Sequence, residues 1–304
     1  MVYHTLISCV GYYKTLILKR GLMIMTWNIV CDSSSDLLPA ELIPGKLYRK
    51  VAPLTLLVGD KEYVDDATLD VPTLLAHMAA EKGPSSSACP SPDAYYQAFV
   101  SADCSVCITI SGNLSGSFAA AVTARDMVLE EFPEKKICLV DSCSTSGALS
   151  LLDRMAQRLI AEDENDFEGI SEKLLKYRDE QYTVYTLECF DNLIKNGRMK
   201  PLLGTILHTL GIHVIADATP EGTIRVLDKA RGEKKTYRGL VEKMAAFKDY
   251  KDAEVIVSHC QNPAGAEKMK AIILETLPVK SVDLQECRGL NTFYAMDQGI
   301  IISG

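Results

Sequence analysis

Residues 104–131 read CSVCITISGNLSGSFAAAVTARDMVLEE and pass from an apolar run through a loop of serines and glycines into a helical pattern. The run at 104–110 is almost continuously apolar, which is typical of a parallel strand covered on both faces. From residue 116 to 131 the apolar residues recur at intervals of three and four, which predicts a helix. A buried strand, a hydroxyl-rich loop and a helix in this order predict one unit of a doubly wound α/β domain.

The same alternation extends to both sides and defines a first domain at 25–163. Further buried strands are predicted at 27–31 and 136–140, and further helices at 72–81, 92–100 and 146–161. Two strand-like runs at 48–58 and 61–64, joined through Gly59-Asp60, predict a hairpin inserted near 48–66. We therefore expect a mainly parallel sheet with helices on both faces.

A second domain is predicted at 164–304, where the pattern changes. Strands are predicted at 183–187, 212–216, 223–227, 254–258 and 279–284, and helices at 168–180, 233–247 and 264–275. The turn Pro220-Glu221-Gly222 joins two of these strands and predicts antiparallel pairing. This half is therefore expected to be an α+β domain with a mixed sheet.

The first 24 residues are set apart from both domains. Their apolar run at 12–18 is broken by Lys14 and followed by Lys19-Arg20, which is the wrong charge order for a signal peptide. The run is also too short to cross a membrane, so no stable membrane insertion is expected. We expect residues 1–24 to be a non-native or disordered extension.

The composition is that of a soluble globular protein, with 304 residues, 47% of them hydrophobic and 24% charged. The formal net charge of −8 argues against a nucleic-acid or anionic-membrane binder. The ten cysteines are scattered, and we expect reduced thiols in the cytoplasm. Cys104 and Cys107 have metal or redox spacing, but positions three apart on a strand point to opposite faces. No metal or cofactor is predicted.

Four hydroxyl-rich loops are predicted between a strand and a helix, at 33–35, 85–87, 111–117 and 142–146. The carboxyl ends of parallel strands border the usual ligand crevice of an α/β sheet, and the N–H groups that open a helix favour an anion. Hydroxyls without a nearby base can hold a carboxylate but are poorly equipped to break a bond. The loops therefore predict a binding protein, and no catalytic residue is predicted.

The loop at Ser115 allows two further interpretations. Ser115 could simply cap the helix that follows it, whereas Gly112 and Gly116 would let a ligand approach the backbone closely. The arrangement is also similar to the loops of sugar-phosphate isomerases, which makes an enzyme acting on a phosphorylated small molecule the alternative. The absence of a basic partner and of a glutamate base in this loop argues against that alternative.

One stretch of the chain concentrates basic residues. It contains Lys229, Arg231, Lys234, Lys235 and Arg238. A solvated helix face is the simpler interpretation, and a docking surface for an acidic or phosphate-handling partner is the other. The turn at Asn196-Gly197 places Arg198 as a further candidate for such a surface.

Five short motifs occur in order between about residue 27 and the end of the sequence: 87–92 (SACPSP), 111–118 (SGNLSGSF), Asp141-Ser142, 196–199 (NGRM) and 230–235 (ARGEKK). Together they resemble the motifs of the DegV family. Ser87-Ala88-Cys89-Pro90-Ser91-Pro92 resembles its T-S-Q-P-S-P, and 111–118 (SGNLSGSF) resembles its S-S-x-L-S-G-T-Y. Asp141-Ser142 matches its D-S, Asn196-Gly197-Arg198-Met199 is similar to G-G-R-I, and 230–235 (ARGEKK) is similar to V-R-G-x-K-K.

The resemblance implies a two-domain protein that holds one long-chain fatty acid in a tunnel. By position, Ser87 takes the family's threonine role and Ser115 its serine role in binding the carboxylate, with Ser111, Gly116 and Asn291 beside them. The first domain would hold the headgroup, and the second would close the acyl tunnel.

The resemblance also implies a partner, since some members present the acid to a separate fatty acid kinase for phospholipid synthesis. Arg198, Arg231 and Lys235 are the residues we expect to dock such a kinase. The family's H-T-G-P-G-A is replaced here by Asn291-Thr292-Phe293-Tyr294-Ala295. Asn291 thus stands where the family has a histidine, which removes a residue associated with presentation to the kinase.

Overall fold

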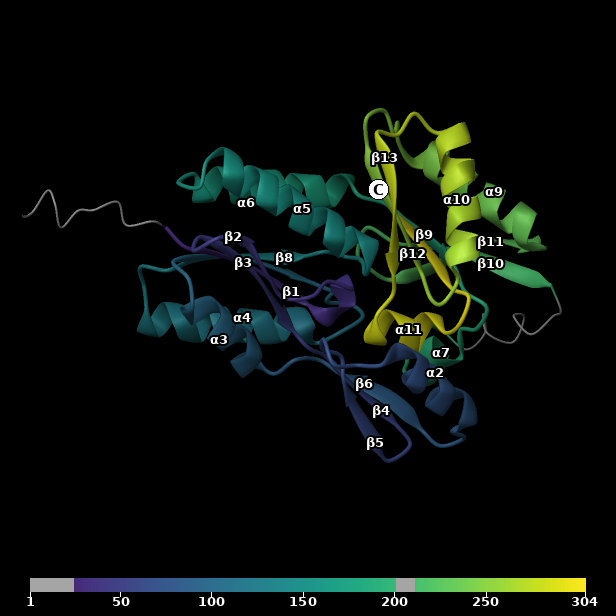
Figure 1. The fold of residues 1–304 in the computed structure, drawn as a ribbon, viewed down its shortest axis with the longest axis horizontal. Helices are drawn as coiled ribbons and strands as arrows, with labels where there is room; N and C mark the ends of the chain where they lie inside the picture. Colours follow the sequence, from purple (N-terminus) through teal and green to yellow (C-terminus); the bar gives the residue numbers. More distant parts are fainter. Residues whose placement is uncertain (1–24, 201–210) are drawn as a thin grey trace, which may run out of the picture.

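The computed structural model describes residues 25–200 and 211–304, which form three sheets and the helices around them (Figure 1). The strand orders are β2-β3-β1-β7-β8, β11-β10-β9-β14-β12-β13 and β5-β4-β6. The first sheet belongs to the amino-terminal half and the second to the carboxyl-terminal half. The predicted fold class, a doubly wound domain followed by an α+β domain, is confirmed.

The first sheet is parallel except at one edge. Its strands are β1 (Trp27–Asp32), β2 (Ala40–Ile43), β3 (Leu47–Ala52), β7 (Cys104–Thr109) and β8 (Lys136–Asp141). β3, β7 and β8 continue the parallel ladder from β1, and β2 pairs antiparallel with β3. β1 and β7 are buried along their whole length, which explains their unbroken apolar sequence.

Helices cover both faces of this sheet (Figure 1). They are α3 (Pro92–Val100) and α4 (Ser117–Glu131) on one face, and α5 (Gly147–Glu162) and α6 (Phe167–Glu180) on the other. Separate apolar clusters fill the two layers, one around Phe99 and Val128 and the other around Trp27 and Leu152. The carboxyl ends of the strands are left uncovered and face the second domain.

The small third sheet differs from the sequence-based prediction in two respects. Its strands are β4 (Thr55–Val58), β5 (Lys61–Val64) and β6 (Ser85–Ala88), and α2 (Val71–Ala80) lies between the last two in sequence. The run predicted at 48–58 is interrupted at Pro53, so that its first part joins β1 and its second part forms the hairpin with β5.

Ser87 was predicted in a loop at the start of a helix, and this is wrong. The residue lies in β6, opposite Leu56 of β4, and α3 begins only at Pro92 with Ser91 as its cap. Serine has a low preference for strands, but the backbone of β4 supplies the hydrogen bonds that hold β6.

The second sheet is mixed. Its strands are β9 (Thr183–Thr186), β10 (Ile212–Ala218), β11 (Ile224–Arg231), β12 (Glu254–His259), β13 (Ser281–Glu286) and β14 (Ile300–Ser303). Only β12 and β13 are parallel. Within the described residues, the helices of the second domain are α7 (Asp191–Lys195), α9 (Glu233–Phe247), α10 (Pro263–Thr276) and α11 (Gly289–Ala295). One face packs on α9 and α10 around Leu240 and Met269, and the other turns toward α7, α11 and the first domain (Figure 1).

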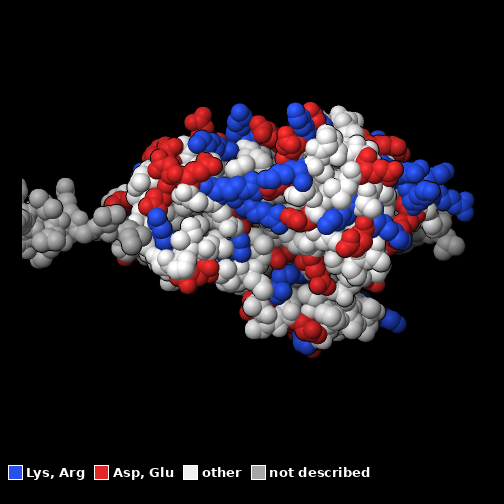
Figure 2. Space-filling view, turned by 45° about the horizontal axis from the view of Figure 1, so that its top comes forward, with Lys and Arg blue, Asp and Glu red and all other residues white. Residues whose placement is uncertain are grey.

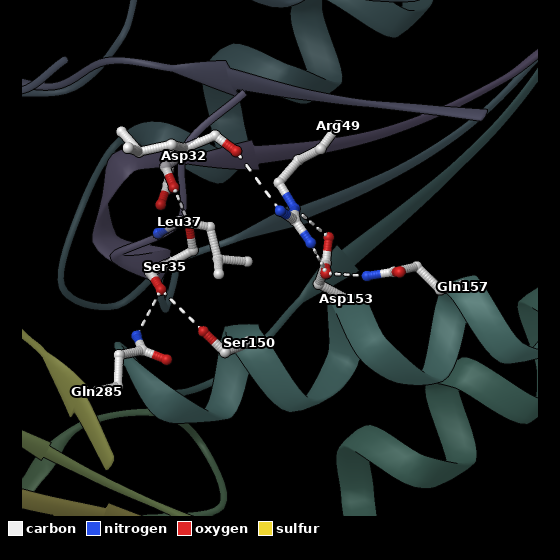
Figure 3. Close-up of polar contacts among 9 residues, drawn as sticks. Asp32, Ser35, Leu37, Arg49, Ser150, Asp153, Gln157 and Gln285 are labelled. Carbon is white, nitrogen blue, oxygen red and sulfur yellow. Dashed lines mark hydrogen bonds and ion pairs between the residues drawn. The ribbon is translucent and has the colours of Figure 1, made fainter. Parts of the chain in front are cut away.

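The 3-10 turn η1 (Ser33–Ser35) holds the two halves together (Figure 3). The backbone oxygen of Ser35 accepts hydrogen bonds from Ser150 of α5 and from Gln285 of β13, at 3.0 and 2.9 Å. Nearby, Arg49 and Asp153 form a two-point ion pair that ties β3 to α5. The serines predicted here as a ligand loop are therefore buried structural residues.

Candidate ligand-binding pocket

A pocket lies where the carboxyl ends of the first sheet meet α11 and the inner face of the second sheet. About half of its lining side chains are apolar. They are Leu54, Ile110, Leu114, Leu187, Leu193, Ala218, Ile224, Leu290, Ala295 and Ile301. The space between the walls is about 750 Å³ with the open mouth included. The surface that these walls expose to the pocket is mainly apolar, so the pocket is a largely apolar slot.

Two of the predicted binding serines reach this slot from different elements. Ser87 lies on β6, and its hydroxyl is 2.8 Å from the hydroxyl of Tyr294 on α11. Ser115 lies just before α4, and its oxygen accepts the backbone N–H of Ser117 at 3.3 Å. That contact leaves the proton of Ser115 able to donate to a ligand. Each of the two serine hydroxyls can therefore donate to a ligand oxygen in the slot.

Asn291 also lines the slot, but its amide is engaged within the protein. Its nitrogen donates to the backbone oxygen of Ser34 at 2.7 Å and to the carboxylate of Asp36 at 2.8 Å. Its oxygen accepts from the Thr145 hydroxyl at 2.6 Å. Asn291 therefore positions α11 against the first domain.

Two buried carboxylates hold the start of α11. Asp65 accepts the backbone N–H groups of Gly289 and Leu290 at 2.9 and 2.8 Å, and Asp36 accepts that of Arg288. Burial raises the pKa of Asp36 to about 7, although hydrogen bonds from Ser146, Arg288 and Asn291 act in the opposite direction. Burial also raises the pKa of Asp65. The wall of the slot thus depends on acids that belong to the first domain.

Ser111 and Gly116, the other predicted binding residues, do not line the slot. The Ser111 hydroxyl donates to the backbone oxygen of Gly222 at 2.7 Å, in the tight turn of the second domain. Gly222 has a φ of +77°, and a Cβ there would lie 2.2 Å from the Ser111 oxygen, so only glycine fits this contact. A Cβ at Gly116 would meet the Cys89 thiol at 3.1 Å. These residues shape the loop around Ser115.

The predicted docking residues fall into two places. Arg198 lines the slot, where its guanidinium donates to the backbone oxygen of Leu114 at 3.0 Å. Arg231 and Lys235 lie at the end of β11 and the start of α9, in the exposed basic cluster. Figure 2 shows blue side chains gathered at the end of the molecule where β11 and α9 lie.

Tyr294 and Thr145 line the slot, although neither was among the predicted binding residues. Tyr294 follows Leu290 and Asn291 at helical intervals of four and three, so all three share one face of α11. That spacing is a usable signal only if a helix is predicted at 289–295, and none was. Thr145 belongs to the predicted loop at 142–146, which does reach the slot.

These features define a two-domain α/β protein with a slot whose walls are largely apolar and whose lining carries several hydroxyl groups from both domains. The family model for DegV, described as an uncharacterised protein family, matches residues 26–294. The chain belongs to the DegV family.

Comparison with relatives and solved structures agrees with this assignment. A DegV domain-containing protein of Streptococcus pyogenes serotype M1 is 35% identical over 278 residues, which cover 91% of this chain and 99% of the relative. The Streptococcus pneumoniae Fatty Acid Kinase (Fak) B3 protein, loaded with linoleic acid, has a TM-score of 0.87 and 34% identity, covering 92% of this chain and 99% of that one. A DegV family protein from Eubacterium eligens, loaded with heptadecanoic acid, has a TM-score of 0.85 and 30% identity, with 91% and 99% covered.

Proposed function

We propose that this chain binds one long-chain fatty acid non-covalently in the slot between its domains. The observation that carries the proposal is a largely apolar slot with hydroxyl groups in its lining, in a fold whose similar solved structures hold linoleic and heptadecanoic acid. A phosphorylated small molecule, the alternative from the sequence, would leave the apolar walls without a partner. Arg198 is the one cationic side chain lining the slot among the described residues, and its guanidinium is already hydrogen-bonded to backbone oxygens.

In this proposal Ser87 and Ser115 hold the carboxylate and the apolar walls hold the chain. Burying about 16 carbons at about 0.8 kcal/mol per methylene contributes on the order of 10 kcal/mol before the costs of binding. Each hydroxyl bond to a carboxylate adds roughly 1.5–3 kcal/mol. The walls therefore set most of the affinity, and the two serines set the orientation of the acid.

Mass spectrometry of the denatured recombinant protein tests the proposal. A stoichiometric fatty acid released on denaturation is the expected result. If the protein releases no lipid and calorimetry detects no binding of added C16 or C18 acids after delipidation, the proposal is wrong.

We further propose that the protein acts in the cytoplasm and presents the acid to a separate kinase through its basic cluster. The five basic side chains of this cluster are exposed, and among the described residues none forms an ion pair. The neighbouring acids Asp228 and Glu233 pair instead with Lys243 and Lys268.

The nine cysteines within the described ranges are free thiols, in keeping with a reducing compartment. Within those ranges every helix is too short or too polar to span a bilayer.

Charge reversal separates this docking role from lipid binding. Arg231→Glu with Lys235→Glu should leave fatty acid affinity unchanged, because both residues lie outside the slot. Acyl phosphate formation with a cognate kinase should fall steeply, and more so at low salt, where unlike charges attract over a longer range. If the double variant instead loses fatty acid affinity but still supports turnover by the kinase, the basic cluster lies at the mouth of the slot and does not dock the kinase.

A further inference from the structure

Tyr185 lies on the wall of the slot that the second domain contributes. It occupies the middle of β9, with Ala216 of β10 and Ile301 of β14 as its cross-strand neighbours. Side chains alternate along a strand, and Thr183 and Leu187, two positions to either side, also line the slot. The Tyr185 ring is therefore on the face of β9 that a bound chain would contact.

The hydroxyl of Tyr185 is buried and has no hydrogen-bond partner among the residues that the structure describes. Three other buried or pocket tyrosines differ in this respect, whereas the hydroxyl of Tyr250, away from the slot, is also unpartnered. The hydroxyls of Tyr95, Tyr182 and Tyr294 are paired with Ser117, Asp217 and Ser87. Burial raises the pKa of Tyr185, and the charge of Asp217 acts in the same direction, so the phenol keeps its proton and can only be satisfied by an acceptor.

An unpaired buried hydroxyl is costly, and a phenylalanine would fill the same space without that cost. The apolar neighbours of Tyr185 in its cluster, such as Leu187, Ala216 and Ile301, carry no side-chain acceptor. A saturated hydrocarbon chain in the slot would leave the phenol unpaired as well. A ligand that carries a hydrogen-bond acceptor along its chain would accept a hydrogen bond from the Tyr185 hydroxyl.

We propose that the preferred ligand is an acyl chain with an oxygen substituent along its length, a hydroxyl or keto group, and that Tyr185 donates a hydrogen bond to that oxygen. The inference rests on the proposed function and narrows its ligand class. Tyr185 is then a specificity-determining residue, because a site that forms a hydrogen bond with the oxygen substituent binds an acid without that substituent less tightly.

Affinity measurements on a series of C18 acids test this role. The delipidated full chain is titrated by calorimetry with stearic acid and with positional isomers of hydroxystearic acid. At least one isomer should bind about tenfold more tightly than stearic acid to the wild type. In Tyr185→Phe the preference should disappear, with stearic acid bound at least as tightly as before.

Tyr250→Phe is the matched control. Tyr250 is also buried with an unpartnered hydroxyl in the described structure, but it belongs to the cluster beneath α9 and does not line the slot. This variant should keep the wild-type preference. Equal affinity of the wild type for stearic acid and every isomer would overturn the inference while leaving fatty acid binding intact. Failure of all the acids to bind the wild type would instead overturn the proposed function.

Discussion

The serines buried in the first domain and the serines that line the slot have the same side chain but different partners. Ser33, Ser34, Ser117 and Ser146, which we call the buried serines, form hydrogen bonds with buried carboxylates or backbone groups of the protein. Ser87 and Ser115, which we call the pocket serines, line the slot.

The difference separates serines whose hydrogen bonds are made within the fold from serines that line the slot. Ser115 and Ser117 are two residues apart, yet Ser117 is fully buried and donates to Asp32, while Ser115 is half-buried and lines the slot. A buried serine beside a buried aspartate has its hydrogen bonds completed within the fold. Composition alone does not separate the two kinds of serine.

Removing the carboxylate of Asp32, which accepts hydrogen bonds from two of the buried serines, should have the largest effect on the free energy of unfolding. Asp32 accepts from the backbone of Ile110 and Ser34 and from the hydroxyls of Ser34 and Ser117. Asp32→Ala leaves these buried donors unpaired and should lower the free energy of unfolding by about 3 kcal/mol or more. Chemical denaturation measures it. Asp70→Ala, an exposed helix cap on α2, is the control and should cost about 1 kcal/mol.

Removing a pocket serine should have a smaller effect, on binding only. Ser87→Ala should weaken fatty acid affinity by about 1.5–3 kcal/mol, roughly ten- to a hundredfold, because one donor to the carboxylate is lost. The free energy of unfolding of the lipid-free protein should stay within about 1 kcal/mol of the wild type. Calorimetry that finds unchanged affinity would remove Ser87 from the headgroup site.

The free energy of unfolding should depend on pH because the pKa of the buried Asp36 carboxyl group is raised in the folded protein. The pKa of Asp36 is raised to about 7 by burial, against about 3.9 in an unfolded chain. Between these values the folded state holds a proton that the unfolded state has released, so the free energy of unfolding falls as pH rises from about 4 to 7. One such group contributes a slope of up to about 1.4 kcal/mol per pH unit. The free energy of unfolding, measured by chemical denaturation at pH 5, 6 and 7, should fall less steeply with pH in Asp36→Ala than in the wild type. Equal slopes in the two proteins would contradict this assignment.

Much of the fold was predictable from periodicity. The helices predicted at 92–100 and 233–247 match α3 and α9 to the residue, and the strands of the first sheet are correct within one residue for β1, β7 and β8. These elements bury a continuous face, which the sequence records as an apolar pattern.

Elements that depend on distant partners were missed. α11 is seven residues long, and its first N–H groups are held by Asp65, more than two hundred residues earlier in the sequence. β6 consists mainly of serines and exists because β4 pairs with it. Residues 1–24 lie outside the described residues. Of the predicted binding residues, Ser87, Ser115 and Asn291 meet at the slot, but the local sequence does not show which hydroxyls the fold itself uses.

Parallel measurements on Ser115→Ala and Ser117→Ala test the central claim most directly. Ser115→Ala should weaken fatty acid binding by about 1.5–3 kcal/mol and leave the unfolding of the lipid-free protein nearly unchanged. Ser117→Ala should lower the free energy of unfolding by about 1–3 kcal/mol, because Asp32 and Tyr95 lose their shared partner, and should leave the affinity of the folded protein nearly unchanged. If instead both variants lose lipid affinity equally, or Ser115→Ala loses stability rather than binding, the division between buried serines and pocket serines is wrong.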